Sequence, residues 1–139
     1  MTSRPRVTDA DYTRLLRLRT RLRKFEHWSA EQAGTMGLTA SQHQLLLAIR
    51  GHGGQDAPTI GDVADYLLVR HNTAVELVNR TQELGLIDRQ RDGADHRVVR
   101  LSLTDEGLKR LNALSADHLE ELARLAAVVD ELFDTLHRT

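Results

Sequence analysis

The chain has 139 residues, of which 40% are hydrophobic, 28% charged and only 4% aromatic, and its formal net charge is −1. These values are typical of one compact domain with a core of aliphatic side chains, and they exclude a disordered chain and a nonspecific polycation. Cysteine is absent, which excludes disulfides, thiolate metal sites and thiol redox switches, and neither a signal peptide nor a long apolar run is found, so we expect a cytoplasmic protein that does not enter a membrane.

The first predicted helix runs from Thr8 to about Gly34, with Thr8 or Asp9 as its N-cap. Its apolar residues recur at spacings of three and four, which is the stripe of an amphipathic helix. The members of this stripe are Leu15, Leu18, Leu22 and Phe25. The first 25 residues are rich in arginine and residues 105–139 are rich in carboxylates. We therefore expect the two ends to attract each other, within one chain or between two.

Two shorter helices are predicted next. The second helix opens at its N-cap Thr39, and its expected buried residues are Leu46, Leu47 and Ile49. The stretch "GHGGQDAP" is a loop because of its glycines and proline. Thr59 then caps a third helix, "IGDVADYLL". The expected buried residues of this helix are Ile60, Val63, Ala64 and Leu67.

The fourth predicted helix is "RHNTAVELVNRTQEL", which follows after a brief turn. Its expected buried residues are Ala74, Leu77, Val78, Thr81 and Leu84. Gly85 stands where a helix ends in a left-handed residue. A short helix, a tight turn and a longer helix fit a helix-turn-helix, although they also fit any helical hairpin.

A predicted β-hairpin comes directly after these helices. The strands "LIDRQR" and "RVVRLSL" flank the tip "DGADH", and in the second strand Val99, Leu101 and Leu103 share one face. Helix, turn, helix and hairpin in this order predict a mainly α fold with a small β-hairpin wing, which is a winged helix-turn-helix.

The last predicted helix begins near Thr104 and runs nearly to the end of the chain. Its apolar stripe continues over about 30 residues, or roughly 45 Å of helix, which is more than one domain of this size covers by itself. We therefore expect the first and last helices to form a homodimer, and the alternative is a long helix packed back along its own domain. The expected interface residues are Leu15, Leu18, Leu22, Leu122, Leu125, Val129, Leu132 and Leu136.

Four segments of this chain, in this order and at this spacing, carry a resemblance to a known family. They are "LTASQHQLLLAI", "TIGDVADYLLVRHNTAVELVNRTQELGLIDR", "DGADHR" and "VRLSLTDEG". With them, residues 38 to 107 resemble the MarR family of bacterial winged-helix transcription regulators. The resemblance implies a single MarR-like chain in which residues 38–107 are a winged-helix DNA-binding lobe and residues 8–34 and 108–139 are dimerisation helices.

The same resemblance implies a function. It implies a homodimer that binds a pseudo-palindromic operator in double-stranded DNA, most often as a repressor, and that responds to a small phenolic or other lipophilic anion held between the dimer helices and the lobe. Two positions depart from the family. His96 stands in the wing where the family has an arginine, and Glu76 stands where an outward residue of the recognition helix is often basic. These departures affect the operator and the affinity for it.

The candidate base-reading residues lie on the fourth helix. A helix fits the major groove of DNA, where Asn pairs with adenine and Arg with guanine. The outward or N-terminal residues of the predicted recognition helix are Arg70, His71, Asn72, Thr73, Asn79 and Arg80. The alternative is a solvated helix face with no partner.

The charged tip of the hairpin is the second candidate contact. A wing beside a major-groove helix lies near the adjacent minor groove, whose narrow A·T stretches attract a guanidinium. Arg97 is the candidate, and Asp95 is placed to hold its guanidinium with a charge-assisted bond. Arg89, Arg91 and Arg100 are predicted phosphate contacts on the strands. The alternative is an ordinary charged turn.

The sequence contains no recognisable motif for metal binding or for catalysis. The 7 histidines are scattered, with no pair at ligand spacing on one helical face, so we expect no metal site and no cofactor. A phosphate loop and a nucleophile elbow are also absent, so we expect no enzyme. The alternatives are a metal-responsive regulator of the same fold and a helical protein-interaction module that binds no DNA, which would need neither Asn72 nor Arg97.

Overall fold

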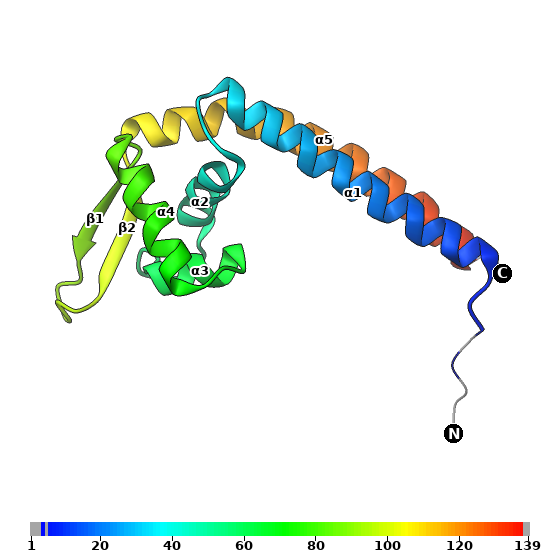
Figure 1. The fold of residues 1–139 in the computed structure, drawn as a ribbon, viewed down its shortest axis with the longest axis horizontal. Coiled ribbons are helices and arrows are strands. Elements are labelled where there is room, and N and C mark those ends of the chain that lie inside the picture. Colours follow the sequence, from blue (N-terminus) through cyan, green and yellow to red (C-terminus); the bar gives the residue numbers. More distant parts are fainter. Residues whose placement is uncertain (1–3, 5, 138–139) are drawn as a thin grey trace. The chain divides into compact units, whose positions relative to one another are not determined.

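The computed structural model describes residue 4 and residues 6–137, with side chains up to residue 134. The chain divides into two compact units, which we call the helical unit (residues 1–31 and 116–139) and the lobe (residues 32–115). The elements, labelled in Figure 1, are α1 (Asp9–Thr35), α2 (Ala40–Gly51), α3 (Ile60–Leu67), α4 (His71–Glu83), β1 (Ile87–Arg91), β2 (Val99–Leu103) and α5 (Asp105–His137). Helices α1 and α5 contribute residues to both units.

The lobe has the predicted mainly α fold with a small hairpin. Strands β1 and β2 pair antiparallel, with Ile87 opposite Leu103 and Arg91 opposite Val99, and α4 lies beside this hairpin (Figure 1). Aliphatic side chains from α2, α3, α4 and both strands meet in one core. Its largest fully buried members are Leu45, Leu46, Leu86, Ile87, Leu101, Val63 and Val78. The alternation of β2 therefore has the predicted sense, with Leu101 turned inward.

Helices α2 and α3 begin at the predicted N-caps. The hydroxyl of Thr39 accepts the backbone N–H of Gln42, and the side chain of Gln42 accepts the N–H of Thr39 in return. Thr59 and Asp62 form the same reciprocal pair at α3. The bond from the Thr59 N–H, more than any other contact, holds the pKa of the Asp62 carboxyl below its ordinary value. Both helix starts are therefore defined by local sequence.

Two residues adopt the left-handed conformation around α4. Gly85 does so with φ 75°, as predicted, and ends the helical segment. Leu68 does so with φ 57°, immediately after α3, which ends one residue before its predicted end. The N–H of Leu68 donates to the carbonyls of Ala64 and Asp65, and the N–H of Val69 donates to the Ala64 carbonyl at 3.1 Å. This pattern is a Schellman cap in which leucine occupies the position where glycine is usual.

Two predicted core leucines are wrong. Leu47 is exposed, and Leu45 is buried in its place, because the packed face of α2 is centred on His43, Leu46 and Ile49. Leu84 is also exposed, because it is the C-cap of α4, where the chain turns toward β1. In both cases the helix itself was predicted correctly. The errors are the choice of buried face on α2 and the end of the buried face on α4.

The first turn of α5 lies against the segment that links α4 to β1. The Thr104 N–H donates to the Leu86 carbonyl at 3.0 Å, and the Thr104 hydroxyl donates to the Gly85 carbonyl at 2.7 Å. Gly107 comes so close that a Cβ there would lie well inside van der Waals contact of the Leu86 carbonyl oxygen. Glycine at residue 107 is thus required by a close backbone approach.

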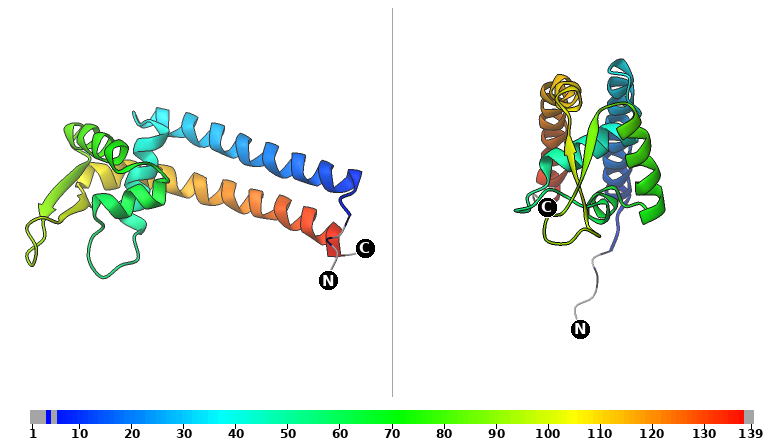
Figure 2. Two further views of the ribbon diagram at one scale, coloured as in Figure 1. Left: turned by 60° about the horizontal axis from the view of Figure 1, so that its bottom comes forward. Right: turned by 90° about the vertical axis from the view of Figure 1, so that its left-hand side faces the viewer.

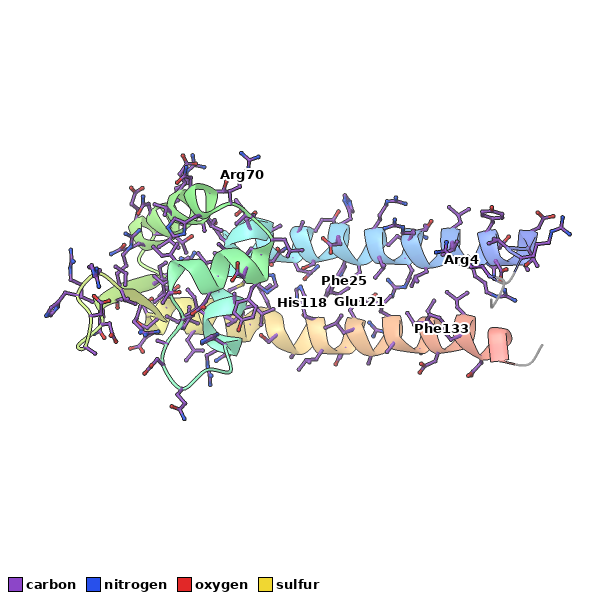
Figure 3. The ribbon with its side chains drawn as sticks, turned by 90° about the horizontal axis from the view of Figure 1, so that it is seen from below. Arg4, Phe25, Arg70, His118, Glu121 and Phe133 are labelled. Atoms are coloured by element: carbon purple, nitrogen blue, oxygen red, sulfur yellow. The ribbon has the colours of Figure 1, made fainter. Side chains whose placement is uncertain are left out.

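The helical unit consists of the N-terminal part of α1 and the C-terminal part of α5, which run side by side (Figure 2). Arg21 and Glu121 form an ion pair across them at 2.5 Å, which is one within-chain contact between the basic and acidic ends. Near it, the Ser29 hydroxyl hydrogen-bonds Nε2 of His118 at 2.7 Å, and the His118 ring packs against Phe25 and Trp28. Figure 3 shows Phe25 and His118 on the two helices. Leu125 is buried in this pairing.

Much of the predicted interface stripe stays exposed within the chain. Leu15, Leu22 and Leu122 are all exposed, and so are the neighbouring Leu119 and Phe133. Leu18, Val129 and Leu132 are half-buried, and the side chain of Leu136 lies outside the described residues. In the described part of the chain, no helix is both long enough and apolar enough to span a membrane.

Candidate nucleic-acid interface

The start of α4 is open, unlike the starts of α2 and α3. Arg70 is its N-cap residue but makes no capping bond with its side chain. His71, Asn72 and Thr73 follow on the first turn, and all are exposed. Figure 3 shows Arg70 projecting away from the lobe at this end of α4. The free amides of a first helical turn, with basic and amide side chains around them, suit a negatively charged partner.

The remaining predicted residues of α4 lie further along its exposed face. Arg80 is exposed and, together with Glu76 and Thr73, lines a groove between α4 and the start of α2. Asn79 is also exposed, and its side-chain oxygen accepts a hydrogen bond from the guanidinium of Arg89 on β1. This bond links α4 to the first strand of the hairpin.

The wing tip has the predicted clamp. The Nε of Arg97 donates to Asp95 Oδ1 at 3.2 Å, Nη2 donates to Oδ2 at 3.4 Å, and the Arg97 backbone N–H adds a third bond at 3.0 Å. Those bonds, with the guanidinium first, hold the pKa of the Asp95 carboxyl below its ordinary value. The Arg97 side chain is nevertheless 91% exposed. A cation is therefore held in place while its outer surface stays available.

The strand arginines fall into two kinds. Arg91 donates to the His96 carbonyl at 2.8 Å and remains exposed. Arg100 is different, because its guanidinium donates to the Ala57 carbonyl at 2.9 Å and to Asp92 at 3.4 Å, and it also lies 3.8 Å from Asp56. Next to it, the Leu101 N–H donates to the Pro58 carbonyl at 2.8 Å. Arg100 thus ties the wing to the loop before α3.

Comparison with known proteins relates this part of the chain to a protein family. Residues 36–98, from just before α2 to the end of the hairpin tip, match the family model described as the MarR family. This part of the chain belongs to the MarR family.

Similar proteins and structures agree with the MarR assignment. The chain is 26% identical over 83 residues to the HTH-type transcriptional regulator PecS of Dickeya dadantii, a match that covers 60% of this chain but only 50% of PecS. It is 25% identical to the HTH-type transcriptional repressor MdtR of Bacillus subtilis, over 89% of this chain and 79% of MdtR. The solved S. aureus MepR–DNA complex aligns with a TM-score of 0.70 at 20% identity, over 96% of each chain. The predicted winged-helix fold is confirmed.

The MarR lobe also contains site features that sequence reasoning missed. Neither the tie between Arg100 and residues 56–58 nor the bond between Asn79 and Arg89 has a local signal, because the partners are 43 and 10 residues apart in sequence. The left-handed Leu68 was missed because leucine favours helices and no glycine marks the stop. Among the described residues, no three His or carboxylate side chains gather at metal-binding geometry.

Proposed function

We propose that the chain is a homodimeric, sequence-specific DNA-binding transcription regulator. One observation carries the proposal: the open, exposed start of α4 and the clamped Arg97 belong to the same MarR-family lobe, in which Asn79 of α4 is hydrogen-bonded to Arg89 of the wing. A solvated helix face would have no need of an arginine held in place at the neighbouring hairpin tip. The printed name of MdtR and the DNA in the MepR complex support the same function for this chain.

In this proposal α4 enters the major groove and the wing reaches the adjacent minor groove. Asn72 and Thr73 read base edges, while Arg70, His71, Asn79 and Arg80 contact base edges or phosphates. Arg97 enters the minor groove, held by Asp95. Arg89 and Arg91 lie along the strand as phosphate contacts. Arg100 mainly positions the wing, because its guanidinium is already bonded to Asp92 and to the loop before α3.

A second copy of the chain completes the proposed regulator. The apolar side chains left exposed on α1 and α5 are too many for a solvated surface and too regular in spacing for chance. A two-fold dimer would cover them and would place two lobes on the two halves of a pseudo-palindromic operator. We further propose that the dimer acts as a repressor, as MdtR is named, and that a small lipophilic anion is its effector.

A gel shift with the DNA upstream of the protein's own gene, with random DNA of equal length as competitor, tests the proposal. We expect one retarded band at nanomolar protein that random DNA does not displace, and a footprint with two-fold symmetry. Repeating the titration with phenolic acids tests the effector. Equal affinity for both DNAs, or no binding to either, would exclude sequence-specific regulation and leave the helical interaction module.

A further inference from the structure

Leu68 is the residue whose conformation and exposure the fold itself does not explain. It is the only non-glycine residue with positive φ among those described, and its side chain is 91% exposed. A leucine in the left-handed conformation is disfavoured by contact between its Cβ and the backbone, whereas glycine adopts it freely. The bonds of the cap are donated by the backbone N–H groups of residues 68 and 69 to backbone carbonyls of α3, so glycine would cap α3 equally well.

The core gains nothing from this side chain. Leu67 and Val69 on either side are more buried, and both line the groove between α4 and α2, which Leu68 does not. An outlier that the fold does not require points to a function that it serves. The cap instead fixes the backbone of Leu68 at a set position, two residues before the N-cap Arg70. Leu68 therefore stands at the entry to α4, four and five residues ahead of Asn72 and Thr73 in the sequence.

We propose that Leu68 is an apolar DNA contact of the helix-turn-helix, an inference that rests on the proposed DNA-binding function. The major groove offers one apolar group, the C5-methyl of thymine, and its rim offers the carbon face of deoxyribose. A leucine side chain can pack against either of these apolar groups. Because the Schellman cap already orders the backbone of residue 68, little conformational entropy is lost when the contact forms.

Three variants test this inference. Leu68→Gly removes the side chain and relieves the backbone, so we expect the Tm to rise by roughly 2–6 °C while operator binding weakens about fourfold for each half-site. Leu68→Ala removes the side chain but keeps the strained backbone, so we expect the same weakening without the rise in Tm. Leu84→Ala is the matched control, because Leu84 is an exposed leucine at the opposite end of α4. It should change neither quantity.

Operators with single thymines replaced by deoxyuridine separate the two sources of apolar contact, because this change removes only the methyl group. A thymine contact predicts one position per half-site at which the wild type loses affinity and Leu68→Ala does not. A deoxyribose contact predicts no such position and an equal loss on operator and random DNA. The inference is overturned if Leu68→Gly and Leu68→Ala both bind operator like the wild type. If the wild type itself binds no DNA, the proposed function fails first and this inference falls with it.

Discussion

Asp95 and Arg97 form the smallest unit whose role can be measured. If Arg97 enters the minor groove, each wing places one cation near the phosphates. Without that cation, fewer counterions are released from the DNA when the protein binds. Arg97→Ala should therefore weaken operator binding and make the plot of log affinity against log salt shallower by about one unit per wing, or about two per dimer. Fluorescence anisotropy over a salt series measures both. An unchanged slope would mean that the tip is only a soluble turn.

Asp95→Ala supplies the matched control for charge. It keeps the cation but releases the guanidinium from its two side-chain bonds. We expect a smaller loss of affinity than for Arg97→Ala and an almost unchanged salt slope. In the double variant, Asp95→Ala should add little, because Asp95 acts only through the arginine. A full additive loss would instead show that Asp95 has a separate role at the DNA.

At the scale of one helix, substitutions in α4 can distinguish base reading from phosphate binding. Asn72→Ala or Thr73→Ala should lower the discrimination between operator and mismatched DNA by roughly 1–3 kcal/mol, because a base-edge contact is lost. Arg80→Ala should weaken binding to both DNAs similarly. Competition titrations with the two DNAs give the result. Equal losses on both DNAs for Asn72→Ala and Thr73→Ala would show that they do not read bases.

The capping box of α3 has a pH dependence with a defined sign. Because the pKa of Asp62 is lowered in the folded chain, mainly by the Thr59 N–H, its charged form stabilises the fold above the unfolded pKa near 3.8. This stabilisation is lost as the pH falls through the lowered, folded-state pKa. Asp62→Asn should therefore shift the midpoint of urea unfolding by a constant amount at neutral pH, and the shift should shrink in acid.

Two further variants serve as comparisons for Asp62→Asn. Thr59→Ala removes the other half of the box and should cost about 1 kcal/mol of unfolding free energy at neutral pH. Asp65→Asn, on the same helix, removes an exposed carboxylate that makes no capping bond, and it should leave the midpoint unchanged. If Asp62→Asn behaved like Asp65→Asn at every pH, the box would contribute nothing to stability.

Elements with local signals were predicted correctly, and the errors occurred where the signal is distant or ambiguous. Thr39, Thr59 and Gly85 mark helix ends through bonds to residues within one turn, so their types suffice. The run "LLLAI" matches more than one helical face, and only packing decides that Leu47 is outside. Arg100 is one of four arginines around the hairpin, and nothing in the sequence distinguishes its bond to Ala57 from a phosphate contact.

At the scale of the whole molecule, assembly is the property to test. Light scattering at micromolar concentration should give twice the chain mass. Leu122 is 43% exposed within the chain and Leu125 only 8%. Leu122→Asp should therefore give a folded monomer, because it places a charge in the seam between chains. Leu125→Asp should also disrupt the pairing of α1 with α5 inside one chain and lower the Tm.

Ala127→Asp is the control for the charge itself. Ala127 is exposed on α5 and lies three and four residues from Arg124 and Glu131, on the charged side of the helix. The variant should remain a dimer by light scattering. A monomeric wild type would contradict the proposed assembly, and a dimeric Leu122→Asp would place the contact on another face of the helical unit.

Gly107 has a consequence for mutational tolerance across the chain. Glycine within a helix is normally about 1 kcal/mol less favourable than alanine, so Gly34→Ala, where a Cβ meets open space, should raise the Tm. At Gly107 the sign reverses, because the Leu86 carbonyl occupies the space that any side chain would need. In a library of single substitutions selected for folded protein, residue 107 should accept no replacement. Propensity scales rank the two glycines alike, and only the fold separates them.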